Sequence, residues 1–260
     1  MRDTMAQPAT AELANSAHGP MTVVQAAAFD TAYRLEVATS EAQRAAAYAV
    51  RYQVYCEEFT CYEPKARFPD HLEHNASDDH SIHMLVRRRS DGVAVATSRL
   101  VLTDPAAPTA PLPFEAACSD TLYPWAVPED ASSRRSIAEL SRYAILKEFR
   151  RHHVDSFTDF ENLAQPMLPV AMALFSEAVA LQAGIQSIFA VMEDRLAEGA
   201  RTFGMRLIPI GSPTAFHGMR TPYCVDFSAC SVLFPDLHRM ASATALAAVA
   251  HVGLDALRAP

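Results

Sequence analysis

The stretch Ala138-Glu139-Leu140-Ser141-Arg142 carries the clearest chemical signal in the sequence. Alternate residues of a β-strand share a face, so Glu139 and Ser141 are predicted to point one way and Leu140 and Arg142 the other. Burial inside an apolar strand raises the pKa of a Glu toward that of a workable general base. A buried ion network that only braces the sheet is the competing interpretation, and both stay open. The candidate ion partners are Arg51, Arg99 and Arg142.

A second signal follows at the end of the same segment. The run Lys147-Glu-Phe-Arg150-Arg151-His-His153 is the densest group of basic side chains in an acidic chain. Cations at the end of a strand can bind the phosphate of a phosphate-bearing donor. Lys147, Arg150 and Arg151 are therefore the candidate donor-binding residues, and an ordinary solvated turn is the alternative.

Metal and cysteine chemistry are less well supported. The paired histidines are His71 with His74, His80 with His83, and the doublet His152-His153. The first two pairs fall in a predicted loop and at a strand entry, and no second motif completes a site, so we predict no metal. Cys56 and Cys224 lie in apolar patterns that are typical of buried, inert thiols rather than of a nucleophile.

The elements that must position these residues follow from hydrophobic periodicity. We expect a strand over Tyr33–Ala38 and a helix from Ser40 to about Phe59. Its aromatic residues Tyr48, Tyr52, Tyr55 and Phe59 are expected to face the core. A hairpin over 81–102, a long Pro-rich excursion over 104–133 and a strand over 136–145 follow. The remaining expected elements are a helix over 165–182, a strand over 185–192, a helix over 194–203, strands over 205–210 and 223–230, and a helix over 235–257.

This order predicts a mixed α/β fold, with a central and mostly antiparallel sheet flanked by helices. The length of 260 residues fits one domain over residues 31–260 after a mobile leader over residues 1–30. A net charge of −8 argues against a nucleic-acid partner. Without a signal-peptide pattern or roughly 20 consecutive apolar residues, the chain is expected to be cytoplasmic and not stably inserted in a membrane.

Short motifs in order along the chain resemble the GNAT acyltransferases, and among them the acyl-homoserine-lactone (autoinducer) synthases. They are Arg51-Tyr-Gln-Val-Tyr55, Asp78-Asp-His-Ser-Ile-His83, Ser98-Arg99-Leu100, Pro111-Leu-Pro-Phe-Glu115 and Glu139-Leu-Ser-Arg142. The motifs Gly211-Ser-Pro and His217-Gly-Met-Arg-Thr-Pro-Tyr223 are more similar to the PEP-CTERM/exosortase-associated acyltransferases and the N-acyl amino acid synthases. The resemblance covers about residues 33–235.

What the resemblance implies is a GNAT-like fold and N-acylation. A fatty acyl group would move from an acyl carrier protein or acyl-CoA thioester to the amine of an amino acid or similar small molecule, with no permanently bound cofactor. The charged set of the lactone-synthase pattern matches Arg51, Asp78 (or its neighbour Asp79), Arg99, Glu139 and Arg142.

In the mechanism that this implies, Glu139 is the base, acting through a water molecule, and a strand-edge amide near Ser141–Tyr143 polarises the thioester carbonyl. Arg99 or Arg142 would hold an acceptor carboxylate. The predicted catalytic residues are thus Glu139, Ser141 and Arg142, and the predicted substrate-binding residues are Arg51, Asp78, Arg99 and Tyr143. The available lining of an acyl tunnel is Met167, Leu168, Met172, Phe175 and Phe189, for which plain core packing is the alternative.

Two departures from the family pattern bear on the substrates. Where the lactone synthases carry a Trp after the first helix, this chain offers Phe59 and Tyr62, which favours an amino acid over adenosylmethionine as acceptor. The Gly-rich pyrophosphate loop of GNAT enzymes is missing after Phe149, which favours a carrier protein over coenzyme A. The alternatives are a non-catalytic GNAT-like module that binds an acyl group or its carrier, a lactone synthase, and a coenzyme-A-dependent acetyltransferase of small amines.

Overall fold

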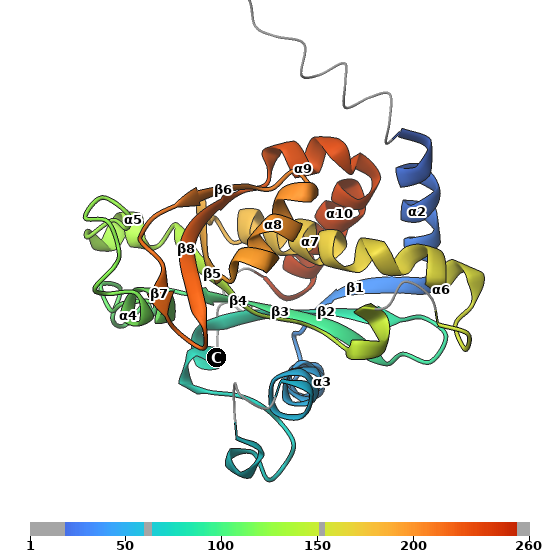
Figure 1. Cartoon of the computed structure of the whole chain (residues 1–260), viewed down its shortest axis with the longest axis horizontal. Coiled ribbons are helices and arrows are strands. Elements are labelled where there is room, and N and C mark those ends of the chain that lie inside the picture. The colour runs from blue at the N-terminus through green and yellow to red at the C-terminus, as the bar shows by residue number, and fades with distance from the viewer. Residues whose placement is uncertain (1–18, 60–63, 151–153, 254–260) are drawn as a thin grey trace, which may run out of the picture.

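A computed structural model of the protein describes residues 19–59, 64–150 and 154–253 and has a twisted mixed sheet at its centre (Figure 1). The strands are β1 Tyr33–Val37, β2 Ser81–Arg88, β3 Ala94–Leu102, β4 Ile137–Ile145, β5 Ser187–Met192, β6 Arg206–Pro209, β7 Thr214–Ala215 and β8 Met219–Asp226. Their order is β1-β2-β3-β4-β5-β8-β6, with β7 beside β8. β4 and β5 run parallel, whereas the other neighbouring pairs in the described chain are antiparallel. The predicted mixed, mostly antiparallel sheet is confirmed.

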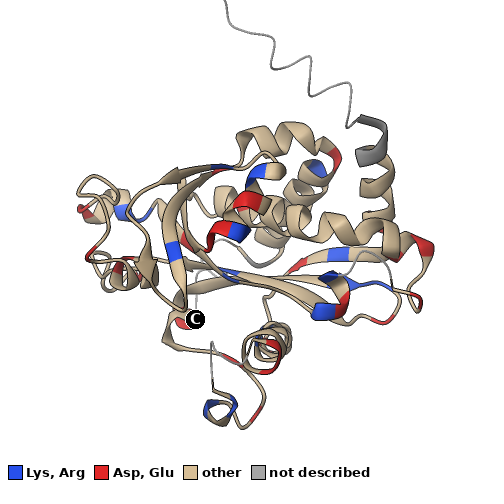
Figure 2. Cartoon of the chain, in the orientation of Figure 1, with Lys and Arg blue, Asp and Glu red and all other residues tan. Residues whose placement is uncertain are grey.

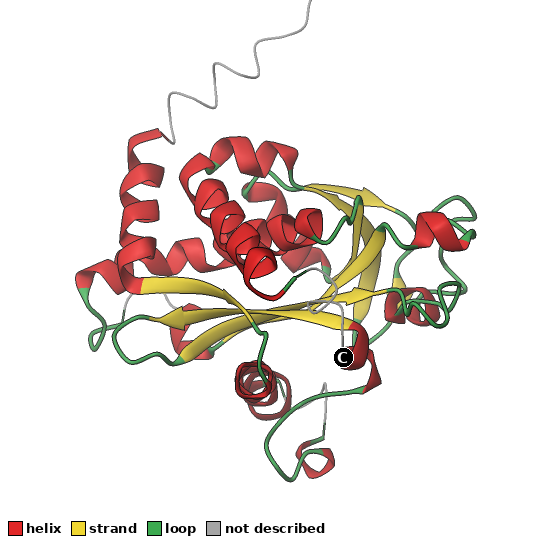
Figure 3. Ribbon diagram, turned by 180° about the vertical axis from the view of Figure 1, so that it is seen from behind, coloured by secondary structure: helices red, strands yellow, loops and turns green. Residues whose placement is uncertain are grey.

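Helices cover both faces of this sheet (Figure 3). The α-helices are α2 Gly19–Ala32, α3 Glu41–Tyr52, α4 Pro113–Ala117, α5 Ala131–Arg134, α6 Asp159–Ala164, α7 Leu168–Gln182, α8 Asp194–Thr202, α9 Ser228–Leu233 and α10 Pro235–Val252. A π-helix, η1 Gln53–Glu58, and the 3-10 turns η2 Lys65–Arg67, η3 Ala76–His80, η4 Lys147–Arg150 and η5 Gln165–Met167 complete the elements. Helices α7 and α3 contact the same strands, β2, β3 and β4, from opposite sides.

The two faces of the sheet differ in chemistry because alternate residues of a strand point to opposite sides. On β3, Leu100 belongs to the large apolar core that includes α7, and Ser98 meets Ser176 of α7 at 3.0 Å between hydroxyl oxygens. Arg99, between them, points to the side of α3 and hydrogen-bonds to Asp78. We call the side covered by α7 the apolar face, and the side covered by α3, residues 64–80 and α4 the polar face.

Helix α3 begins as predicted and ends differently. Ser40 forms a capping box with Gln43, which satisfies the first N–H groups of the helix. After Tyr52 the helix continues as the π-helix η1, whose wider turn shifts each later side chain away from α-helical periodicity. The prediction that Phe59 faces the core was therefore wrong: it is 41% exposed, and the guanidinium of Arg150 lies 5.0 Å from its ring centroid.

Strands β4 and β5 lie side by side only where they begin. Their parallel pairing joins Ile137–Glu139 to Ser187–Phe189. β4 then continues along β3, while β5 continues along β8, which turns out of the plane of β1–β4 (Figure 1). Within the described chain, the edge of β4 after Glu139 thus has no neighbouring strand. We call this divergence the β4/β5 split, with its apex at the Glu139–Phe189 pair.

A β-bulge interrupts β4 just beyond the apex of the split. Arg142 and Tyr143 together stand opposite the single residue Ser98 of β3, and Arg142 has a φ of 50°, in the left-handed region. The prediction that strict alternation turns Arg142 away from the face of Ser141 was therefore wrong. The bulge returns the Arg142 side chain to the polar face, where it binds Glu73.

The Pro-rich excursion over 104–133 is folded and builds a small second core on the polar face. Phe114 of α4 stacks on Phe189 of β5, with ring centroids 5.0 Å apart. Arg134 of α5 is buried and binds Glu115 at 2.6 Å, and it also donates to the carbonyl oxygens of Pro108 and Ala110 at 3.0 and 2.8 Å. One guanidinium thereby joins separate parts of the excursion to one another.

The ends of the chain also depart from the predictions. Order was expected from about Tyr33, but helix α2 already begins at Gly19, packs against α6 and buries Phe29. Residues 1–18 lie outside the described residues, and the division into leader and single domain stays a prediction. The strand expected over 223–230 ends at Asp226, whose side chain accepts the N–H of Ser228 at 2.9 Å and starts α9.

Among the described residues, one helical stretch, Asp159–Gln182, is long and apolar enough to span a membrane by length and composition. It is instead largely internal, because 78% of its most apolar window is buried inside the protein. It comprises α6, η5 and α7, and its apolar side chains form the core of the apolar face.

Candidate functional site

A buried ion network occupies the polar face between α3 and β3. Arg51, in the last turn of α3, donates from Nε to Glu73 and from its two terminal nitrogens to Asp78, at 2.7 and 3.0 Å. These three side chains are at most 3% exposed. The two-pronged contact fixes the orientation of the Asp78 carboxylate as well as its charge. Figure 2 shows that charged residues occur on strands of the sheet as well as on helices and loops.

Two arginines of the sheet join this network. Arg99 donates to Asp78 at 2.6 Å and to the Ser141 hydroxyl at 3.2 Å, and Arg142 donates from Nε to Glu73 at 3.2 Å. The Arg142 side chain is 22% exposed and that of Arg99 only 3%. The structure thus brings together the predicted residues Arg51, Asp78, Arg99, Ser141 and Arg142. Among the arginines, Arg142 is the one that reaches solvent.

Attraction outweighs burial for the two carboxylates of the network. Burial alone would raise the pKa of Asp78, but the hydrogen bonds and charges of Arg51 and Arg99 hold it well below its usual range. The pKa of Glu73 is also lowered, because Arg51 and Arg142 outweigh its burial. Both carboxyl groups are therefore ionised at neutral pH and are poor proton acceptors.

Glu139 has the opposite electrostatic character. It lies at the apex of the β4/β5 split, is 6% exposed, and accepts the main-chain N–H of Phe114 at 2.7 Å. Burial raises its pKa, against the opposing effects of the Phe114 N–H and of the Arg99 and Arg142 charges. A carboxyl whose pKa moves toward neutrality suits a general base, and the predicted burial of Glu139 is confirmed. Its catalytic role stays a prediction.

Tyr143 divides its contacts between the two faces. Its hydroxyl donates to the carbonyl oxygen of Pro169 in the first turn of α7, so its ring belongs to the apolar face. Its own carbonyl oxygen accepts the hydroxyl of Tyr55, 3.0 Å away on η1. The main chain of Tyr143 thus lies at the bulge, while its side chain points away from the ion network.

The predicted donor-binding residues follow β4 closely. Lys147 is exposed, and its N–H donates to Glu58 at 3.0 Å. Arg150 forms an ion pair with the same Glu58 and is 34% exposed. Arg151 lies outside the described residues, as do His152 and His153. The basic edge is therefore partly neutralised by one acid, and its role in donor binding stays a prediction.

Glu73 and His83 are members of the site that sequence reasoning missed. Glu73 lies between His71 and His74, which had drawn attention only as metal candidates. The charged set that matches the lactone-synthase pattern contains more arginines than carboxylates. This excess of positive charge could have indicated that a further acidic residue belongs to the site. His83 is 1% exposed, and its ring nitrogens have no hydrogen-bond partner among the described residues, although Nε2 lies 3.7 Å from Asp78. Burial lowers the pKa of His83 to about 4.

The residues predicted to line an acyl tunnel are buried in two places. Four of them, Met167, Leu168, Met172 and Phe175, belong to the core of the apolar face. Phe189 belongs instead to the second core beside Phe114. Their packing agrees with the alternative of plain core residues, and the tunnel stays a prediction.

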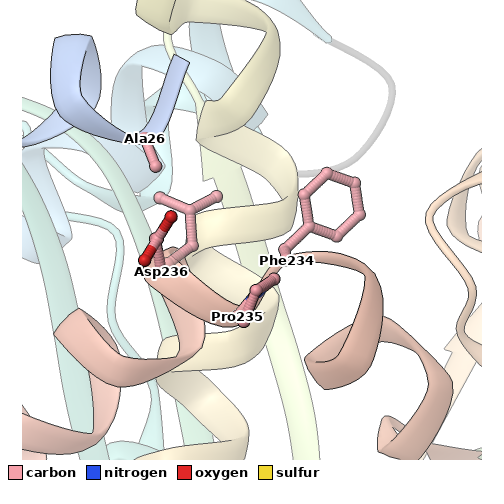
Figure 4. Close-up of a pocket in the computed structure, with 5 residues that line it drawn as sticks. Ala26, Phe234, Pro235 and Asp236 are labelled. Carbon is pink, nitrogen blue, oxygen red and sulfur yellow. The ribbon is translucent and has the colours of Figure 1, made fainter. Parts of the chain in front are cut away.

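A small hollow lies elsewhere, where α2 meets the start of α10 (Figure 4). Ala26, Phe234, Pro235, Asp236 and Leu237 line it. Its cavity volume of about 10 Å³ is far below the several hundred that small-molecule sites usually have. Ala26, Phe234 and Leu237 belong to the apolar-face core, so the hollow is separate from the ion network.

Comparison with known proteins agrees with this architecture. Residues 50–158 match the family described as "Acetyltransferase (GNAT) domain". The structure of TofI in a ternary complex with an inhibitor and MTA is 20% identical, with a TM-score of 0.55, over 80% of this chain and 99% of that one. The AHL synthase LasI is 17% identical, with a TM-score of 0.55, over 78% and 93%.

The CoA-dependent acyl-homoserine lactone synthase BjaI, solved with SAM and isopentyl-CoA, is 18% identical, with a TM-score of 0.52, over 79% of this chain and 89% of that one. No curated protein sequence matches the chain significantly. At these identities the structural likeness concerns the fold, and it confirms the predicted GNAT-like arrangement. The closer resemblance to PEP-CTERM-associated acyltransferases stays a prediction.

Proposed function

We propose that this chain, which contains a GNAT acetyltransferase domain, is an N-acyltransferase that moves a fatty acyl group from a thioester to the amine of an amino acid or similar small molecule. The observation that carries the proposal is the apex of the β4/β5 split. There the buried carboxyl of Glu139, with its raised pKa, lies beside a strand edge whose main chain is interrupted by a bulge.

Acyl transfer to an amine needs a neutral amine, a polarised carbonyl and reactants held in line. In the proposed reaction Glu139, through a water molecule, accepts a proton from the acceptor ammonium. The amine nitrogen then bonds to the thioester carbonyl carbon, the carbon–sulfur bond breaks, and the thiol leaves carrying a proton. An N–H within Ser141–Tyr143, at the bulge and on the part of β4 that has left β5, would hydrogen-bond the carbonyl oxygen.

The exposure of the arginines supports a division of roles among them. All three arginines bind carboxylates of the network, but Arg51 and Arg99 are almost fully buried, so we assign them, with Asp78, to holding the shape of the acceptor pocket. Arg142 is partly exposed and lies at the bulge next to the proposed carbonyl site. An acceptor carboxylate at Arg142 would place its amine close to Glu139, which favours an amino acid as acceptor.

For the donor we propose an acyl carrier protein, with acyl-CoA as the alternative. The basic run at Lys147 to Arg151 follows the end of β4, where a phosphopantetheine arm entering the split would carry its phosphate. Carrier proteins present acidic surfaces, and an exposed Lys147 complements such a surface. A cytoplasmic location, where such carriers act, stays a prediction.

The function is tested by incubating the full chain with acyl carrier proteins or coenzyme A that bear acyl groups of several lengths, together with pooled amino acids. Mass spectrometry then detects N-acyl products. The proposal expects long-chain N-acyl amino acids from the wild-type chain. Products from short acyl groups alone would favour an acetyltransferase, and the absence of any product with every donor would favour a module that only binds.

A further inference from the structure

Two irregular elements of the molecule meet at one point beside the proposed site. The first is the π-helix η1 that extends α3, and the second is the bulge of β4 at Arg142 and Tyr143. Tyr55 of η1 donates its hydroxyl to the carbonyl oxygen of Tyr143 at 3.0 Å. The guanidinium of Arg142 lies over the Tyr55 ring, 5.5 Å from its centroid. One side chain thus contacts both bulged residues.

The Tyr55 hydroxyl supplies a hydrogen-bond partner to the main chain at the bulge. An extra residue in one strand interrupts the ladder, so main-chain groups there need partners from outside the sheet. For the carbonyl of Tyr143 that partner is Tyr55. The Tyr143 ring is tied separately to the opposite face through its hydroxyl and Pro169. The Tyr143 peptide is therefore held from both sides of the sheet.

The π-helix explains how Tyr55 comes to this position. A π-turn adds a residue to the turn, so side chains after Tyr52 lie at different angles from those of a continued α-helix. Burial raises the pKa of Tyr55, so its hydroxyl keeps the proton that it donates at neutral pH. Such turns are frequent at functional sites, and here the irregularity of the helix is matched to that of the strand.

We infer that Tyr55 is a positioning residue for the acyl-transfer step. Its hydroxyl fixes the β4 bulge so that the N–H groups of Ser141–Tyr143 keep the direction needed to polarise the thioester carbonyl. The inference rests on the proposed function and adds to it a residue outside the charged motif set. Tyr55 acts through the main chain of β4.

The test compares Tyr55→Phe with Tyr52→Phe. Tyr52 lies three residues earlier, and its ring stacks on that of His71 with the ring centroids 4.8 Å apart. The control therefore also removes a tyrosine hydroxyl from this helical segment, but one that lies away from the bulge. Hydrogen exchange of the main-chain amides over 140–146 is measured on both variants without substrate. Tyr55→Phe should exchange these amides roughly tenfold faster than wild type, and Tyr52→Phe should not.

Steady-state kinetics supply the second measurement. Because losing a whole oxyanion donor costs about 10²–10³-fold in kcat, loosening one should cost Tyr55→Phe roughly tenfold in kcat with little change in the KM of the donor. Tyr52→Phe should behave as wild type in both constants. Thermal unfolding of all three proteins verifies that the losses occur in folded protein.

The outcomes separate the two claims. Unchanged exchange and unchanged kcat in Tyr55→Phe, with an active wild type, would overturn the role of Tyr55 and leave the proposed function intact. Equal losses in Tyr55→Phe and Tyr52→Phe would also overturn it, since both would then reflect general packing. A wild type that forms no product would overturn the proposed function itself, and with it the catalytic meaning of any change in exchange.

Discussion

The two faces of the central sheet are built from the same strands by different physics. On the apolar face, α7 buries side chains such as Leu174 and Phe175, and stabilisation grows with the apolar area removed from water, in any orientation. On the polar face, Arg51, Glu73 and Asp78 are also buried. Burial costs these charged groups their hydration, and only well-directed hydrogen bonds between them offset that loss of free energy.

The two faces differ in how strictly they fix the positions of individual side chains. Hydrophobic cores tolerate exchange of side chains of similar volume, so the apolar face supplies stability without fixing individual atoms. The ion network fixes a particular arrangement of Arg99, Ser141 and Arg142 along the split. Glu139, at the apex, is held outside the ion pairs and keeps a raised pKa. The polar face thus holds a carboxyl with a raised pKa beside a buried ion network.

The largest expected effect comes from breaking that frame. Arg51→Met leaves the buried carboxylates Glu73 and Asp78 with fewer cations, and should lower the free energy of unfolding by about 3–5 kcal/mol. Urea unfolding followed by circular dichroism measures it. Arg239→Met is the matched control, because its pair with Asp236 is exposed and should contribute less than about 1 kcal/mol. Similar small losses in both variants would mean that the network does not hold the polar face.

A cavity on the apolar face should affect stability and not chemistry. Leu174→Ala removes a fully buried side chain from α7 and should cost about 3 kcal/mol in the free energy of unfolding. Turnover per folded molecule, measured well below the unfolding transition, should stay within about twofold of wild type. A specific loss of turnover in folded protein would show that the two faces do not divide stability and chemistry as described.

Removing the proposed base should lower turnover and leave stability nearly unchanged. Glu139→Gln keeps the shape of the side chain and an oxygen that can accept the Phe114 N–H, so unfolding should change little. Turnover should fall by roughly 10²-fold, the usual scale for loss of a general base. Rates of product formation under saturating donor and acceptor provide the measurement. Unchanged turnover would remove Glu139 from the mechanism.

The polar face should also make stability depend on pH through His83. Its pKa is about 4 in the folded protein, against about 6.5 when unfolded, so the unfolded state binds more protons between these values. Stability therefore falls as pH falls through this window, by about 2 kcal/mol at about pH 5 relative to about pH 8. Glu139 opposes this trend, because its raised pKa favours the folded state at lower pH.

The variant His83→Phe isolates the histidine contribution. It replaces a ring whose nitrogens have no hydrogen-bond partner in the part of the chain that the structure describes, and should be neutral or stabilising at about pH 8. Urea unfolding at both pH values should show a loss on acidification that is smaller than in wild type by about 2 kcal/mol. An identical loss in both proteins would mean that His83 is not the titrating group.

The smallest effect is expected at the basic edge. Lys147→Glu reverses an exposed charge next to the split, and should raise the KM for an acyl carrier protein donor by roughly three- to tenfold, because rim charges act mainly on association. Arg239→Glu, on the exposed side of α10, should leave that KM unchanged. Equal KM values in the wild type and Lys147→Glu would separate this edge from carrier binding.

The faces also differ in how far the sequence predicts them. Strand alternation and helix caps predicted the hairpin 81–102, the capping of α3 by Ser40 and the burial of Glu139, because these depend on neighbours in the chain. The matched motifs likewise indicated Arg51, Asp78 and Arg99, which do lie together.

What sequence reasoning missed depends on contacts between distant segments. The π-turn after Tyr52 and the bulge at Arg142 are joined by the hydrogen bond from Tyr55 to Tyr143, 88 residues further along the chain, and the sequence patterns predicted neither. Glu73 sits in a loop whose position is fixed by Arg51, 22 residues away. At the end of the folded excursion over 104–133, Arg134 donates hydrogen bonds to the carbonyl oxygens of residues 24 and 26 positions earlier in the chain.

The central claim is that acyl transfer takes place in the β4/β5 split, at Glu139. A crystal structure with a non-cleavable ketone analogue of an acyl-pantetheine thioester tests it most directly. The account predicts that the pantetheine arm lies between β4 and β5, with the carbonyl oxygen within hydrogen-bond distance of an N–H of Ser141–Tyr143. An analogue bound against the apolar face, or at the hollow between α2 and α10, would contradict it.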